Sequence, residues 1–226
     1  AATEIDARKI QPPPLQVITP PQKAPNIVLI LTDDVGYGVP STFGGPVDTP
    51  ALDRLAENGL SYTRFHTTSL CSPTRSALKA GRNHHMVNVG SVQEIATAFP
   101  GNTGQIPNTT APVAEILRLN GYNTAAFGKW HETALTDTSV SGPQHNWPNR
   151  QGFEKFYGFI GAEVNFFRPN IHDGFALVDT EKIRDPEYHF DADIADQAIN
   201  WMRAQKAMTP DKPFFVCHQY KAPHDY

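Results

Sequence analysis

The sequence has few cysteines, no long apolar run and no excess of positive charge, and each of these features excludes a class of protein. Its 226 residues include only Cys71 and Cys217, so a framework of several disulfides is excluded, although a single bridge is not. No run of about 18 apolar residues occurs, which excludes a membrane-spanning helix. Lys and Arg number 19 against 23 Asp and Glu, giving a net charge of −4. Nucleic acid is therefore not expected as the main partner.

Proline and glycine are abundant instead, with 20 and 16 residues, and the prolines cluster in the first 25 positions. Proline fixes φ and removes a backbone donor, so residues 1–25 are predicted to form an extended arm. The folded unit is expected over residues 26–226. The chain begins without Met or an apolar leader, which indicates a removed leader or a fragment. Together with the arm this suggests export to the periplasm or medium, with a cytoplasmic location as the alternative.

The apolar pattern predicts an α/β fold with a mostly parallel sheet flanked by helices. Residues 27–31 form a continuous apolar run, which is typical of a strand buried on both faces. Further strands are expected at 60–65, 122–127 and 213–217, and helices at 51–58, 72–78, 111–120 and 192–206. Residues 133–175 are rich in Gly, Pro, Asn and aromatics and are predicted to be a long ordered loop region or a small excursion. Ligands of such sheets gather at the carboxyl ends of the strands.

Two adjacent carboxylates, Asp33 and Asp34, follow the first predicted strand. Two carboxylates held together raise each other's pKa unless a cation lies between them, and Ca²⁺ and Mg²⁺ favour carboxylate oxygens. A solvated Asp-Asp turn leading into Gly36 is the alternative, because turns often use Asp.

Cys71 stands at the start of a predicted helix, and Arg75 lies four residues further along the same face. The helix N-terminus favours anions, and a guanidinium is well shaped for a tetrahedral oxyanion. From these residues alone, a buried structural cysteine beside a surface arginine explains the pattern equally well.

Cys71-x-Pro73-x-Arg75, continued to Gly81-Arg82, resembles the signature of the type I sulfatases, and the wider match looks most like large bacterial arylsulfatases. The resemblance covers most of the chain and implies an alkaline-phosphatase-like or sulfatase-like fold. Other matching segments are Pro25-Asn26-Ile27-Val28-Leu29, Thr32-Asp33-Asp34-Val35-Gly36-Tyr37-Gly38, Thr49-Pro50-Ala51-Leu52-Asp53-Arg54-Leu55-Ala56, Gly128-Lys129-Trp130-His131, Tyr157-Gly158-Phe159-Ile160-Gly161 and Ala222-Pro223-His224.

The resemblance implies a sulfuric ester hydrolase whose nucleophile is a hydrated formylglycine made from Cys71 by a maturation enzyme. It implies Ca²⁺ as the metal, with Mg²⁺ as the alternative. Asp33, Asp34 and the converted Cys71 match the family's metal ligands.

The resemblance also implies the catalytic residues. Arg75 and Lys129 match groups that hold the formylglycine oxygens and the sulfate, and His131 matches the histidine that contacts the formylglycine hydroxyl. His224 matches the histidine that faces the ester oxygen. Lys129 and His131 are two residues apart, so in an extended segment they share a face.

The family is longer than this chain and takes an Asp-Asn metal pair and a second lysine from a region downstream of the last strand predicted here. We therefore expect residues 26–226 to be the truncated N-terminal part of a catalytic domain. Two alternatives stay open, a phosphonate or phosphate monoester hydrolase of the same superfamily and an inactive fragment that binds metal or anions. The sequence does not identify the alcohol part of the substrate.

Overall fold

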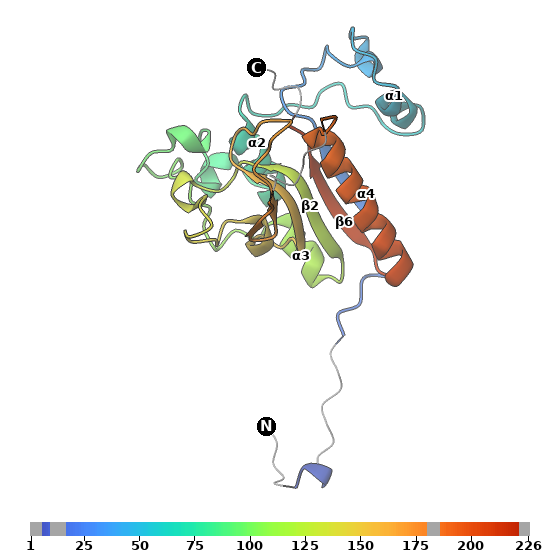
Figure 1. The fold of residues 1–226 in the computed structure, drawn as a ribbon, viewed down its shortest axis with the longest axis vertical. Helices are drawn as coiled ribbons and strands as arrows, with labels where there is room; N and C mark the ends of the chain where they lie inside the picture. Colours follow the sequence, from blue (N-terminus) through green and yellow to red (C-terminus); the bar gives the residue numbers. More distant parts are fainter. Residues whose placement is uncertain (1–5, 10–16, 180–185, 222–226) are drawn as a thin grey trace.

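A computed structural model describes residues 6–9, 17–179 and 186–221 (Figure 1). Within these residues six strands form one sheet with the order β1-β6-β2-β3-β4-β5. The strands are β1 (Ile27–Leu31), β2 (Asn123–Trp130), β3 (Lys155–Ile160), β4 (His172–Asp173), β5 (Ala176–Leu177) and β6 (Phe214–Gln219). The α-helices are α1 (Pro50–Glu57), α2 (Cys71–Ala80), α3 (Val113–Leu119) and α4 (Phe190–Met208). The short 3₁₀ helices are η1 (Ala7–Lys9), η2 (Ser41–Phe43), η3 (His84–Val87), η4 (Gln93–Ile95), η5 (Leu135–Asp137) and η6 (Pro148–Arg150).

The sheet is mostly parallel, as the sequence predicts. Strand β6 lies between β1 and β2 and pairs in parallel with both, and β2 pairs in parallel with β3. The short strands β4 and β5 extend the sheet in antiparallel fashion. The carboxyl ends of β1, β6, β2 and β3 therefore meet at one edge, where the sequence places its polar clusters.

Helices cover both faces of the sheet. Helix α4 lies along one face, over β6, β2 and β3 (Figure 1). The core on that side comprises Ala125, Phe127, Tyr157, Phe159, Ile171, Phe190, Ile194, Ala198, Phe214 and Val216. Helix α3 packs on the other face, against β2. The core on that side comprises Ala114, Tyr122, Ala126, Trp130, Phe153, Phe156, Phe215 and Cys217.

The prediction that the first strand is buried on both faces is wrong. Strand β1 is the edge strand of the sheet among the described residues, and α4 packs on its neighbours instead. Val28 and Ile30 are therefore 48% and 50% exposed, whereas Leu29 and Leu31 pack against the core on the opposite face.

Two further predictions of secondary structure are wrong. Residues 60–65 form no strand, and Leu60, Tyr62 and Phe65 are exposed, because no strand pairs with this segment in the described part of the chain. Residues 133–175 are predicted to be a long ordered loop region or a small excursion, but they contain β3, which is buried beside β2 in the main sheet. The predicted arm is described only at residues 6–9 and 17–25, so its proposed boundary at residue 26 stays a prediction.

Two glycines let three strands approach closely where β2 ends. Gly128 on β2 has φ +100°, and an added Cβ would lie 1.9 Å from the carbonyl oxygen of Gln219 on β6. Gly158 on β3 pairs with Gly128, and a Cβ there would lie 2.0 Å from the Gly128 carbonyl oxygen. Only glycine fits both positions, and Lys129 follows directly after the first.

Neither cysteine is bridged, since Cys71 and Cys217 are both free thiols. Within residues 6–9, 17–179 and 186–221, every helix is too short or too polar to cross a bilayer.

His218 gives a prediction about acid stability. It is 5% exposed, and burial lowers its pKa to about 4. As pH falls below the ordinary value of 6.5, the unfolded chain takes up this proton first, so the free energy of unfolding falls and the loss is complete near pH 4. The expected loss is about 3 kcal/mol at most, from 1.36 kcal/mol per pKa unit.

Urea unfolding between pH 7 and pH 4 checks this prediction. His218→Leu should flatten the acid limb of the stability curve, whereas His85→Gln, at an exposed histidine, should leave it unchanged. An equally steep acid limb in His218→Leu would refute the assignment.

Candidate active site

A cleft of about 1020 Å³ opens where β1 ends and α2 begins. Its lining includes the end of β1, the Asp33-Asp34 pair and the first turns of α2. Residues 65–70 and the Asn83-His84 segment also line the cleft. The cleft is the place where the predicted nucleophile and the predicted metal ligands meet.

Cys71 is the first residue of α2, because Leu70 before it is extended and Pro73 tolerates the opening turn of a helix. The side chain is half-buried, and its Sγ lies 2.9 Å from Nδ1 of His131. Burial raises the pKa of the Cys71 thiol, and the nearby Lys129 and Arg75 oppose that effect. A thiol with a raised pKa is a weak nucleophile at neutral pH, so the unconverted cysteine is poorly suited to attack an ester.

Asp33 lies between two cations. The Lys129 ammonium donates to its Oδ2, and Nη2 of Arg75 lies 3.3 Å from its Oδ1. All three residues are buried, with at most 4% of each exposed. Asp34 is exposed and has φ +54°, a conformation that Asp tolerates better than most residues and that turns the chain away from β1.

Arg75 joins α2 to the ends of two strands. Its Nη1 donates to the backbone carbonyl of Lys129 on β2, at 3.3 Å, and to Oε1 of Gln219 on β6. The fork of the guanidinium thus has one arm on the Asp33 carboxylate and the other on the sheet, which fixes its orientation.

His131 follows β2 directly and is 1% exposed. Its Nε2 lies 2.9 Å from both carboxylate oxygens of Glu94 on η4. Burial lowers the pKa of His131, and the Glu94 carboxylate opposes the shift. The ring therefore connects a carboxylate on one side with the side chain of residue 71 on the other.

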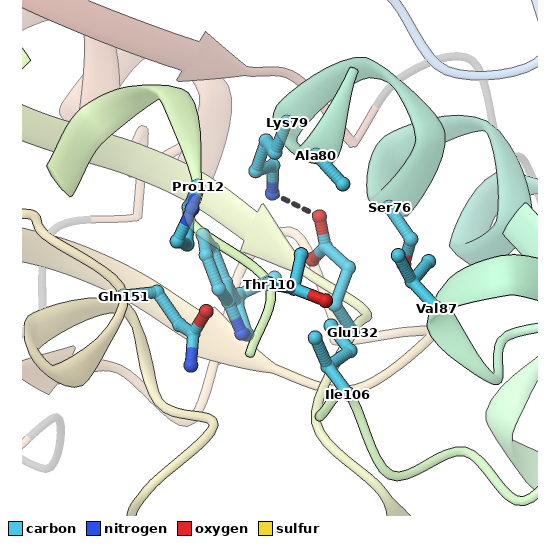
Figure 2. Close-up of a pocket in the computed structure, with 10 residues that line it drawn as sticks. Ser76, Lys79, Ala80, Val87, Ile106, Thr110, Pro112, Glu132 and Gln151 are labelled. Atoms are coloured by element: carbon cyan, nitrogen blue, oxygen red, sulfur yellow. Dashed lines mark hydrogen bonds and ion pairs between the residues drawn. The ribbon is translucent and has the colours of Figure 1, made fainter. Parts of the chain in front are cut away.

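A buried ion pair lies beneath α2. The Lys79 ammonium donates to Oε1 of Glu132 (Figure 2). The same ammonium lies 3.7 Å from the ring centroid of Trp130. The other oxygen of Glu132 accepts the backbone N–H of His131 at 3.0 Å. The cavity beside this pair has a volume of only about 20 Å³, which is room for about one water. The pair ties α2 to the turn that carries His131.

The donor chemistry of the cleft fits part of a hard-cation site. Asp33 and Asp34 supply carboxylate oxygens at the same strand end, and each oxygen has more than one lone pair, so Asp33 keeps acceptor capacity beside its two cations. Within the described ranges, no group of three His, Cys, Asp or Glu side chains is arranged to hold a metal ion.

The structure brings together Asp33, Cys71, Arg75, Lys129 and His131, with Asp34 on the same cleft. His224 lies outside the described residues, so its predicted role stays a prediction. The sequence reasoning missed the residues that support this group, namely Glu94, Gln219, Lys79 and Glu132. Of these only Lys79 carried a usable signal, since a charged residue on the apolar side of a short helix needs a buried partner.

Comparison with known proteins gives a family match over most of the chain. The family model described as Sulfatase matches residues 25–226. An arylsulfatase of Klebsiella aerogenes is 27% identical over 214 residues, which are 90% of this chain and 44% of that protein. Arylsulfatase A of Homo sapiens is 40% identical over 139 residues, which are 60% of this chain and 25% of that protein.

Solved structures give the same result for the fold. The crystal structure of Ps i-CgsB superposes with a TM-score of 0.73 at 27% identity, over 89% of this chain and 46% of that chain. A sulfatase described as putative, yidJ from Bacteroides fragilis, has a TM-score of 0.70 at 22% identity, which supports the fold alone. The chain spans less than half the length of these relatives.

Proposed function

Because the chain belongs to the sulfatase family, we propose that the protein containing it hydrolyses a sulfate monoester, with a formylglycine formed from Cys71 as the nucleophile. One observation carries the proposal. Cys71, at a helix N-terminus, lies against His131, while Lys129 and Arg75 meet on Asp33 at the same cleft. A small tetrahedral anion bound there faces a nucleophile and several positive groups at once.

The formylglycine hydrate supplies two hydroxyl groups on one carbon, so one attacks sulfur and the other later allows sulfate to leave. The residues of the chain bind and orient the reactants around it. Arg75 and Lys129 place positive charge beside the sulfate oxygens, and His131 presents Nδ1 to residue 71. We propose His224 as the donor of the proton that the leaving alcohol or phenol needs.

Asp33 and Asp34 are proposed to hold the metal, which we assign as Ca²⁺ with Mg²⁺ as the alternative. When bound, the cation polarises the sulfate oxygens and adds positive charge to the cleft. The proposed maturation enzyme acts on the segment from Cys71 to Arg75, and the oxidation of Cys71 precedes any turnover.

Asp34→Asn tests the metal assignment. The buried Asp33 makes the ion pairs with Lys129 and Arg75, so neutralising the exposed Asp34 should weaken cation binding and leave those two ion pairs in place. We expect the affinity of the full chain for Ca²⁺, measured by calorimetry, to fall about tenfold or more. Asp48→Asn, at another exposed aspartate, is the matched control. Equal affinities in Asp34→Asn and the unaltered chain would remove Asp34 from the site.

The proposed reaction is tested by two measurements on the full chain. The mass of the peptide containing Cys71 should show loss of hydrogen sulfide and gain of one oxygen, which reports the aldehyde. Parallel rates on an aryl sulfate and an aryl phosphonate should then favour the sulfate. Faster cleavage of the phosphonate would favour phosphoryl chemistry, and Ca²⁺ binding without turnover of either substrate would favour a non-catalytic protein.

A further inference from the structure

We propose that Glu94 is a positioning residue, whose carboxylate holds the His131 ring so that the lone pair of Nδ1 faces the side chain at position 71. The inference rests on the proposed function, in which residue 71 becomes the nucleophile. It also rests on the contact between Glu94 and His131, and Glu94 lies outside the sequence motifs quoted above. Nε2 of His131 lies 2.9 Å from each oxygen of Glu94, and Nδ1 lies 2.9 Å from Sγ of Cys71.

The tautomer follows from the partners of the two ring nitrogens. A neutral imidazole has one N–H, and an ionised carboxylate only accepts hydrogen bonds. Glu94 therefore selects the tautomer with the proton on Nε2, which leaves Nδ1 as an acceptor toward residue 71. Contacts at both ring nitrogens, Nε2 with Glu94 and Nδ1 with Cys71, hold the orientation of the ring.

The surroundings hold Glu94 in place without burying it. Its neighbour Gln93 is buried and donates from Nε2 to the backbone carbonyl of Glu132, at 3.1 Å. The backbone N–H of His131 donates in turn to the Glu132 carboxylate. The segment around η4 is thus joined to the turn after β2 both through Gln93 and through the contact between Glu94 and His131. The Glu94 side chain itself is 39% exposed, so its replacement removes little core packing.

The consequence of this contact is a fixed geometry. Held by Glu94, the His131 ring keeps Nδ1 at hydrogen-bond distance, 2.9 Å, from the side chain at position 71, where the proposed function places the nucleophile. Besides Glu94, the charged groups that face His131 are Lys129 and Glu132.

Glu94→Ala is the main test. We expect kcat on an aryl sulfate to fall by about a hundredfold, within the range for loss of a group that assists acid–base catalysis, while KM changes by less than about threefold. Added acetate should restore part of the lost kcat in a concentration-dependent manner, because the exposed space left by Glu94 admits a small carboxylate. Acetate should not rescue His131→Ala. Glu115→Ala, which removes a partly exposed carboxylate paired with Arg118 on α3, is the matched control and should keep the full rate.

A second readout does not depend on turnover. In chain labelled with ¹⁵N-histidine, the His131 signals should report a proton on Nε2, and Glu94→Ala should give a mixture of tautomers. An unchanged kcat, or a lower kcat without acetate rescue and with unchanged His131 signals, would overturn the proposal. If the unaltered protein hydrolyses no sulfate ester, the proposed function fails, but the tautomer measurement on the unconverted chain still tests the role of Glu94.

Discussion

The Cys71→Ser variant is expected to accept one sulfate group on its serine and then to stop turning over. A serine at the start of α2 has a hydroxyl that can attack sulfur in the same cleft, beside His131. It lacks the second hydroxyl of a hydrated aldehyde, so the sulfated serine has no low-barrier route for losing sulfate. We expect multiple turnover to fall by about 10³-fold or more, as for loss of a nucleophile in other hydrolases.

Mixing Cys71→Ser with an aryl sulfate should release one equivalent of phenol, and the intact mass of the protein should rise by one SO₃ group. Cys217→Ala alters the other cysteine, which is buried on β6, and should retain multiple turnover. If Cys71→Ser turned over repeatedly at the rate of the unaltered protein, the two-hydroxyl cycle would be wrong.

Lys79→Met is expected to lower the free energy of unfolding by about 3–5 kcal/mol, the usual cost of removing one partner from a buried ion pair. The change leaves the Glu132 carboxylate 1% exposed and without its cation. The double variant Lys79→Met/Glu132→Gln removes both charges. Its glutamine still offers an oxygen to the backbone N–H of His131, so most of the lost stability should return.

Urea unfolding of the full chain measures both variants. Lys155→Met is the matched control, because the ion pair between Lys155 and Asp173 is 31% and 50% exposed and should contribute less than about 1 kcal/mol. Equal stabilities for the single and the double variant would contradict the view that an unpaired buried charge causes the loss.

The elements that the sequence predicts well are those with local signals. The apolar run at Ile27–Leu31 is followed by Thr32 and two aspartates. The helix that begins at Cys71 ends at Ala80, and Gly81 after it has φ +62°, as expected of a glycine after a helix. Such signals need no knowledge of the rest of the fold. Such signals predict where an element lies along the chain. They do not predict which neighbours cover it, and the exposed face of β1 was therefore not expected.

The elements that the sequence misses depend on distant partners. Strand β3 contains Gly158 and several aromatics, and it is a strand because it lies beside β2. Residues 60–65 alternate like a strand but have no pairing partner in the described part of the chain. Propensity for a strand is a property of the packed neighbours more than of the segment itself.

The candidate site divides in the same way. The resemblance to a family names Cys71, Arg75, Lys129 and His131, and the structure places them together. Glu94 lies in a turn-rich segment without an apolar periodicity, 37 residues before its partner His131. Only the folded chain shows which carboxylate of the sequence faces the histidine.

The glycines at positions 128 and 158 affect how the backbone that carries Lys129 is held in place. Main chain lies directly against main chain there, with no side chain between β2 and its neighbours that could change rotamer and let the strands shift. Lys129 is the residue of β2 that follows Gly128. Backbone pairing on both sides of β2 therefore fixes the position from which the Lys129 side chain extends to Asp33.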